Sequence, residues 1–176
     1  EEVQAMRENL KKMVTYYKPY KGLFYSDMFF AILGAAVTLA IPLIVRYITG
    51  SVVNRPLQEA TGLIMKLGIL MVVMILVELG CNFYISYFGH IMGARIERDM
   101  RNEIFGHYQK LSFAFYDNQK VGHLLSRVTS DLFDISELLH HGPENIVISC
   151  IKLIGAFVIL LTINPKLALV PILIVA

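Results

Sequence analysis

Three residues in the C-terminal half have the types and spacing that could bind a metal ion. His140 and His141 are followed by Glu144, and imidazole and carboxylate groups are zinc ligands. Adjacent side chains on a helix point about 100° apart, so we expect only one of the two histidines to share a face with Glu144. This arrangement favours a structural role, and the rest of the sequence contains no zinc-ligand spacing. We therefore predict no metal site.

Two ionisable residues, Glu78 and Lys152, interrupt apolar stretches. Such residues are costly in lipid and usually face a bundle interior or a water-filled cavity. Along ideal helices, Glu78 lies about 22 Å and Lys152 about 16 Å from the external helix ends. These depths permit a salt bridge within one subunit or across a dimer. Both residues could line a cavity; alternatively, Glu78 lies near the inner interface and Lys152 snorkels.

Other chemistry is missing from the sequence. There is no G-x-x-x-x-G-K-[ST] phosphate-binding loop and no combination of nucleophile and base, so this chain is not expected to be an enzyme. Cys81 and Cys150 lie in apolar stretches and are expected to be inert packing thiols. A net charge of +2 gives no electrostatic support for nucleic-acid binding.

Long apolar stretches indicate the elements that carry these residues. Hydrophobic residues make up 56% of the 176-residue chain and charged residues 17%, against about 45–50% and about 25% in soluble domains. A membrane span needs about 20 apolar residues. We predict an all-α membrane protein with spans at about 23–47, 63–112 and 123–163. A partial fourth span is expected at 167–176, and a short external loop at 46–62.

The second predicted helix is too long to end at the membrane surface. Charged residues fill 95–103, yet Ile96, Met100 and Ile104 continue an i, i+4 apolar stripe. No proline interrupts 63–112, and a helix of this length spans about 75 Å against a hydrocarbon core of about 30 Å. We therefore expect about 35–45 Å of it to project into water on one side.

Prolines and glycines predict local features of the spans. Pro42 lies near the far end of the first span, where it would kink the helix or loosen its last turns. Pro143 follows Gly142 and predicts an irregularity in the third helix, because the residue before proline avoids the α region. Gly89 and Gly93 are four residues apart, which permits close helix packing.

The alternation of apolar and charged residues in 1–22 predicts an amphipathic helix. Its apolar residues at helical spacing are Met6, Leu10, Met13, Val14 and Tyr17. Next to a span, this helix would lie in the membrane interface with its basic side chains towards anionic lipid headgroups; a solvated leader helix is the alternative. Basic residues are frequent in 1–22 and 95–127 and sparse in 46–66. The positive-inside rule therefore predicts a cytoplasmic N-terminus and hairpin in a multi-pass plasma-membrane protein.

The segment between the second and third long helices carries a recognisable motif. Residues 94–135 resemble the first intracellular loop of bacterial ABC exporters, which has an Arg-rich helix end, Phe-Phe/Tyr-Asp, Gly-x-Leu, Ser-Arg and Asp. The matching residues are Arg98, Arg101, Phe115, Tyr116, Asp117, Gly122, Leu124, Ser126, Arg127 and Asp131. His123 departs from the family, which commonly has Glu there. NPKLAL at 164–169 and Pro42-Leu43 with Arg46 also fit the family.

The resemblance implies that the chain is the front half of a six-span, type 1 exporter transmembrane domain. It implies a nucleotide-binding domain in the same polypeptide or complex, and a second half in a homo- or heterodimer. ATP and Mg belong to that domain, with no cofactor in this chain. Residues 113–122 would form a coupling loop, with a short helix near 116–121. The expected contacts are Phe115, Tyr116, Asp117, Asn118, Gln119, Lys120, Val121 and Gly122. Alternatively, Phe115 and Tyr116 only cap the hairpin.

The resemblance also implies a function. The chain would be the transmembrane component of an ATP-driven exporter that moves amphipathic, drug-like or lipid-like compounds outward by alternating access. Glu78 and Lys152 would then line the translocation cavity, and membrane lipids would surround the spans. The alternative is a membrane-embedded scaffold or interaction protein with a cytoplasmic docking hairpin. A channel or non-ATP carrier is disfavoured because no discontinuous helix pair or ring of charge is present.

Overall fold

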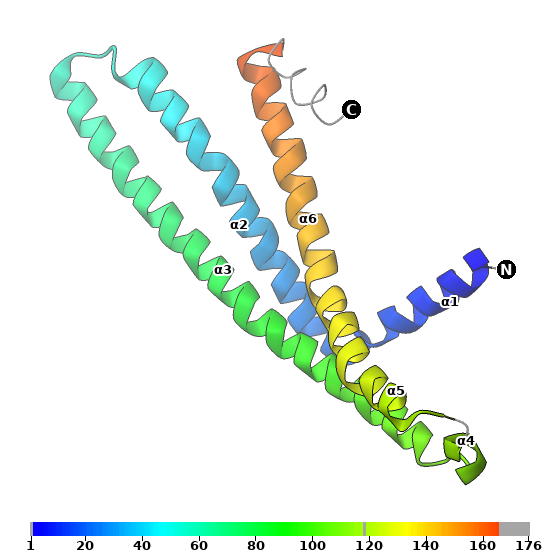
Figure 1. Ribbon diagram of the computed structural model, residues 1–176. Coiled ribbons are helices and arrows are strands. Elements are labelled where there is room, and N and C mark those ends of the chain that lie inside the picture. The colour runs from blue at the N-terminus through cyan, green and yellow to red at the C-terminus, as the bar shows by residue number, and fades with distance from the viewer. Residues whose placement is uncertain (1, 118, 166–176) are drawn as a thin grey trace. The chain divides into compact units, whose positions relative to one another are not determined.

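The computed structural model describes residues 2–117 and 119–165, and these residues are helical with short connections (Figure 1). The predicted fourth span at 167–176 and Asn118 lie outside the described residues. In chain order the elements are α1 (Glu2–Thr15), the 3-10 turn η1 (Lys18–Tyr20), α2 (Lys21–Tyr47), the π-helical turn η2 (Ile48–Val52), α3 (Leu57–Tyr108), α4 (Phe113–Asp117), α5 (Val121–Ser126), the π-helical turn η3 (Arg127–Asp131) and α6 (Leu132–Ile163).

Three helical segments of the described chain are long and apolar enough to cross a membrane. They are Lys11–Val52, Leu57–Tyr108 and Val121–Ile163. In hydrocarbon, a helix satisfies its backbone N–H and C=O groups internally, which is why apolar stretches of this length adopt it. The predicted fold class, an all-α membrane protein with long helices, is confirmed.

The helix α3 begins earlier than the sequence analysis expected, at Leu57 instead of about residue 63. Pro56 directly precedes it, and the Pro56 carbonyl accepts hydrogen bonds from the N–H groups of Glu59 and Ala60 at 3.0 and 2.9 Å. Proline suits a helix start because its missing N–H would have no intrahelical partner there, and Glu59 complements the positive end of the helix dipole. The 52 residues of α3 extend about 78 Å.

The helix α6 is regular where an irregularity was predicted. It continues through Gly142 and Pro143 to Ile163, so the predicted break at this pair is wrong. The irregular turn is instead η3 at Arg127–Asp131. Pro143 has no N–H to donate to the carbonyl of Leu139, four residues earlier. The hydroxyl of Tyr17 donates to that carbonyl, so a partner from another helix compensates for the proline.

Internal contacts divide the chain into two units. Unit 1 comprises Glu1–Asp27 and Ile85–Glu144, and unit 2 comprises Met28–Tyr84 and Asn145–Ala176. The long helices contribute to both units. Residues 85–144 of unit 1, in which α4 and α5 turn the chain back from α3 into α6, are called the polar hairpin below.

Unit 1 has its own apolar core. The buried side chains are Met92, Ile96, Met100, Val128, Leu132 and Leu139, and they are surrounded by half-buried residues of α1, η1, α2 and α3. Ile96 and Met100 belong to the stripe that the sequence analysis identified, and Ile96 is fully buried. Arg101 of α3 also donates from Nε to the carbonyl of Val128 at 3.3 Å. Apolar burial and this hydrogen bond both join the two arms of the hairpin.

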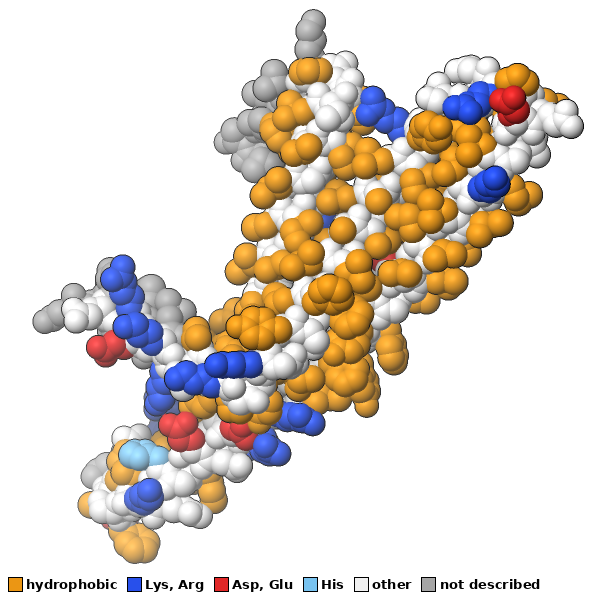
Figure 2. Space-filling model, turned by 180° about the vertical axis from the view of Figure 1, so that it is seen from behind, with side chains coloured by type: hydrophobic (Ala, Val, Ile, Leu, Met, Phe, Trp, Pro, Cys, Tyr) orange, Lys and Arg blue, Asp and Glu red, His pale blue; other side chains and the backbone are white. Residues whose placement is uncertain are grey.

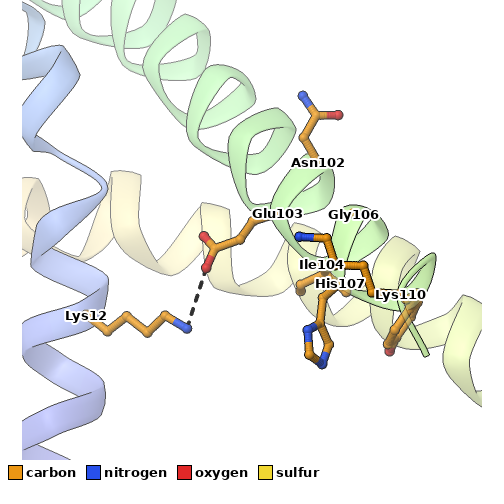
Figure 3. A pocket seen from close by; sticks show the side chains of 8 residues that line it. Lys12, Asn102, Glu103, Ile104, Gly106, His107 and Lys110 are labelled. Atoms are coloured by element: carbon orange, nitrogen blue, oxygen red, sulfur yellow. Dashed lines mark ion pairs between the residues drawn. The ribbon is translucent and has the colours of Figure 1, made fainter. Parts of the chain in front are cut away.

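The end of α1 and the turn after it are attached to α3 by polar contacts. Lys12 Nζ lies 3.7 Å from Glu103 Oε1, and Figure 3 shows the two side chains pointing towards each other across a groove. The hydroxyl of Tyr16 donates to Glu103 Oε2, and that of Tyr20 donates to Asp99 Oδ2, both at 2.6 Å. The polar face of α1 near Lys12 therefore contacts protein, while its interfacial position stays a prediction.

Unit 2 has a largely apolar surface. Figure 2 shows hydrophobic side chains over most of the visible face of the molecule, and the exposed apolar residues of unit 2 include Phe29, Val72 and Leu153. Within unit 2 the rings of Phe30 and Tyr84 lie 4.1 Å apart between centroids. A Cβ built on Gly34 would lie 3.4 Å from Cβ of Cys81, so α2 and α3 approach closely there. An exposed apolar surface of this kind suits contact with lipid or with further spans.

The bond from Tyr17 to the Leu139 carbonyl can be tested by a double-mutant cycle. Tyr17→Phe should destabilise the protein by about 1 kcal/mol, the net value of one hydrogen bond. In a Pro143→Ala background this cost should vanish, because the new N–H of residue 143 can satisfy the carbonyl. Thermal unfolding in detergent measures both. Tyr25→Phe, at an exposed position, is the control, and an equal cost in both backgrounds would contradict the assignment.

Candidate functional site

The tip of the polar hairpin is a short helix, α4, that spans Phe113–Asp117. The N–H of Phe115 bonds the carbonyl of Ser112 at 3.0 Å, which starts the first turn. Lys120 is extended, with φ −77° and ψ 107°, and separates α4 from α5. The short helix predicted near 116–121 is therefore wrong in position. The extended residue at 120 prevents a continuous helix there.

Tyr116 closes the end of α3. Its hydroxyl donates to the carbonyl of Tyr108 at 2.5 Å, and the last carbonyls of a helix lack intrahelical partners. Phe115 packs edge-on against Tyr116, with ring centroids 5.4 Å apart. Both aromatic rings are half-buried. This geometry supports the capping interpretation for Tyr116, and the docking role of the pair stays a prediction.

The most exposed aromatic residue of the tip is Phe113, at 88% exposure. The sequence analysis did not single it out because the family motif drew attention to Phe115 and Tyr116. The described residues of the predicted docking set that are exposed are Asp117, Gln119, Lys120, Val121 and Gly122. The tip therefore presents one aromatic ring and a mixed polar surface.

Glu78 and Lys152 do not pair within the part of the chain that the structure describes. Oε1 of Glu78 instead accepts a hydrogen bond from the hydroxyl of Thr38 at 2.7 Å. That hydroxyl also contacts the Gly34 carbonyl at 2.9 Å, so Thr38 positions the Glu78 carboxyl against α2. Lys152 is exposed on α6. Sequence reasoning missed Thr38 because a threonine in an apolar stretch carries no signal of its own.

A second group of polar side chains converges within unit 1. It consists of Asp27, His90, His140, His141 and Glu144, and is called the polar cluster below. Asp27 and His140 are 1% and 2% exposed, and Glu144 is 8% exposed. One potential ligand atom from each of Asp27, His140 and Glu144 lies within 4.8 Å of the others, and the same holds for His90, His140 and His141.

Both adjacent histidines approach Glu144, so the expectation that only one could do so is wrong. His141 Nδ1 lies 3.7 Å from Glu144 Oε2, and His140 shares a group of potential ligands with the same carboxylate. The two histidines precede Glu144 by three and four residues, and side chains at both spacings meet on a helix face. A difference of 100° in direction is therefore compatible with convergence on one carboxylate.

A glycine on α3 makes room for His140. A Cβ built on Gly89 would lie 1.9 Å from Cε1 of His140, and one on Gly93 would lie 3.4 Å from its Cβ. The predicted close packing at this glycine pair is therefore confirmed. The absence of side chains at these positions lets α3 approach α6 closely enough to bury the His140 ring.

These features define a class of protein: a multi-pass α-helical membrane protein whose long helices extend into a polar hairpin with an exposed tip. Residues 24–176 match the family model described as the ABC transporter transmembrane region. The chain belongs to this family, as the resemblance of the hairpin motif indicated.

Several curated proteins are similar to the chain over most of its length. It is 42% identical over 160 residues to a Bacillus subtilis protein named as an uncharacterized ABC transporter ATP-binding protein, YwjA, with 91% of the chain and 27% of the relative covered. It is 26% identical over 166 residues to "Putative multidrug export ATP-binding/permease protein YgaD" of Bacillus subtilis, with 93% and 29% covered. A Staphylococcus aureus protein with the same descriptive name is 27% identical over 164 residues, with 91% and 28% covered. The chain thus spans under a third of these relatives' lengths.

The close approach at Gly89 predicts a strong effect of one methyl group. Gly89→Ala should lower the thermal stability by about 1–3 kcal/mol, since overpacking forces a buried ring to move. Gly68→Ala on the same helix is the matched control, because a Cβ there meets nothing within 4 Å, and it should be neutral or stabilising. Equal melting temperatures for the two variants in detergent would show that α3 and α6 do not pack as described.

Proposed function

The chain is a transmembrane component of an ABC transporter, and we propose that it serves an exporter that moves amphipathic, drug-like or lipid-like compounds outward. The observation that carries this proposal is the unbroken course of α3 from a membrane-length apolar segment to the hairpin tip. The names of two relatives add support, since both refer to multidrug export.

In this proposal the polar hairpin and the N-terminus face the cytoplasm of the plasma membrane. The basic side chains that are frequent in 1–22 and 95–127 belong to unit 1 and support this orientation. The tip, with Phe113 and residues 115–122, would contact a nucleotide-binding domain. That domain would lie in the same polypeptide, because the relatives are about three to four times longer than the matched part and are named as ATP-binding proteins.

The proposed mechanism is alternating access in a dimer of two halves. Closure of the nucleotide-binding domains on ATP and Mg would move the hairpin tips together. The apolar core of unit 1 and the bond from Arg101 to the Val128 carbonyl join the arms, so the hairpin can transmit this motion as a rigid body. The cavity between the halves would then open outward.

Glu78 and Lys152 are the proposed polar residues of the translocation cavity. Glu78 is held by Thr38, and Lys152 is exposed in an apolar span. A charged side chain exposed at that depth is costly in lipid, which favours a position facing water or a partner half. A scaffold without transport remains the alternative function, and transport assays distinguish the two.

Phe113 provides a test of coupling. In the complete protein reconstituted in liposomes, Phe113→Ala should reduce ATP-driven dye transport about tenfold or more, because loss of a central aromatic contact costs about 2 kcal/mol or more. Melting temperature should be unchanged, since the ring is exposed. Leu57→Ala is the control: Leu57 is 84% exposed at the opposite end of α3. Unaltered transport by Phe113→Ala would remove the ring from the docking surface.

The cavity assignment predicts an effect on substrate handling. Lys152→Met and Glu78→Gln should each change the KM for a lipophilic cationic dye, in opposite directions because they remove charges of opposite sign. Lys66→Met, an exposed lysine near the external end of α3, should behave as wild type. Dye uptake into inverted vesicles gives the KM values. If both variants transport and fold as wild type does, neither residue lines the cavity.

A further inference from the structure

The polar cluster buries several polar atoms that have no hydrogen-bond partner among the described residues. Both carboxylate oxygens of Asp27, both ring nitrogens of His140 and Oε2 of Glu144 are buried without a hydrogen-bond partner among the described residues. An isolated carboxylate removed from water costs several kcal/mol or more. Two such carboxylates lie beside the unpartnered imidazole of His140, and only Glu144 also has His141 nearby, with Nδ1 at 3.7 Å. A bound cation would supply the missing partner.

The unpartnered atoms come from separate helices and converge. Asp27 is on α2, and His140 and Glu144 are on α6, and their ligand atoms lie within 4.8 Å of one another. His90 of α3 approaches from the side, with its ring centroid 5.1 Å from that of His140 and 5.3 Å from that of His141. A tetrahedral zinc ion separates its ligand atoms by about 3.4 Å, so the side chains would move slightly closer together around a bound ion.

The outer residues are arranged as supports of a metal ligand. His141 Nε2 lies 3.4 Å from Glu137 Oε2, and its Nδ1 faces Glu144. A carboxylate on the far nitrogen of an imidazole fixes the ring and its tautomer in metal sites. Glu137 can therefore hold the His141 ring so that Nδ1 points towards a bound ion. The partly exposed position of His141 leaves room for this contact on its outer side.

The ligand atoms available in the cluster indicate which type of metal ion would bind. Imidazole donors favour Zn²⁺ and the neighbouring transition metals over Mg²⁺ and Ca²⁺, which take oxygen ligands. Two carboxylates neutralise a divalent cation, and the cluster contains no thiolate that would favour Cu⁺. A divalent ion with mixed nitrogen and oxygen ligands therefore fits both the charge and the chemistry.

We propose that Asp27, His140 and Glu144 bind one divalent transition-metal ion of the Zn²⁺ type, with His90 and His141 as additional imidazole donors. The ion ties α2 to α6 beside α3, directly before the apolar stretches that begin at Met28 and Ile146. Asp27 and Glu144 are the last residues of unit 1 along their helices. The ion therefore links α2 to α6 where these helices leave unit 1. The proposal does not depend on the transported substrate.

The test uses the complete protein, purified with a histidine-free tag, stripped with a chelator and dialysed against Zn²⁺ or Co²⁺. Plasma mass spectrometry should find zinc equimolar with the chain, and Co²⁺ should give the visible absorption of a nitrogen- and oxygen-ligated ion. Asp27→Asn and His140→Gln should each weaken Zn²⁺ affinity by at least about 100-fold. Zn²⁺ should raise the melting temperature of the wild type, and of neither variant.

Matched controls are Asp134→Asn and His107→Gln, which change exposed residues outside the cluster and should bind Zn²⁺ as wild type does. Wild-type protein that retains no zinc and gives no cobalt absorption would overturn the proposal, whether or not the variants fold. Equimolar, tight binding that persists in an Asp27→Asn/His140→Gln double variant would also overturn it, because the ion would then lie elsewhere.

Discussion

The packing of α3 against α6 within unit 1 is the interaction on which the other features depend. Between spans in lipid, apolar surfaces gain little by association, because lipid tails are as apolar as the side chains. In unit 1, Met92, Ile96 and Leu132 form a buried core, and burial from water stabilises such a core by about 25 cal/mol per Å². The contacts of Tyr16 and Tyr17 to Glu103 and Leu139 attach the turn after α1 to the same pair of helices.

Close approach of these helices has a consequence for charge. Gly89 allows His140 to be fully covered, and the same closeness removes Asp27 and Glu144 from water. Burying polar groups in this way costs free energy unless a partner compensates. A loosely packed hairpin would leave the same groups in contact with water and would not have this cost. A bound cation would compensate the buried carboxylates and would link the helices that carry them.

At the far end of the hairpin, neighbouring aromatic residues have different surroundings. Tyr116 satisfies the carbonyl of Tyr108 and so uses its hydroxyl inside the hairpin. Phe113 is exposed, and under the proposed function its ring would contact the nucleotide-binding domain. Under the proposed function, neighbouring aromatic residues would thus divide structural and recognition roles between them.

The sequence by itself determined the helical membrane fold, the family, and the continuation of α3 past its apolar segment, because these depend on local hydrophobicity, on helical period and on a contiguous motif. The apolar stripe through Ile96 and Met100 was visible for the same reason. The tertiary structure alone decided that Asp27 and His90 join His140, and that Thr38 holds Glu78. These residues are tens of positions apart, so no local pattern links them, and their proximity depends on how closely the helices pack. The break misplaced at Pro143 has a similar cause, since the compensating hydroxyl of Tyr17 lies on a distant segment.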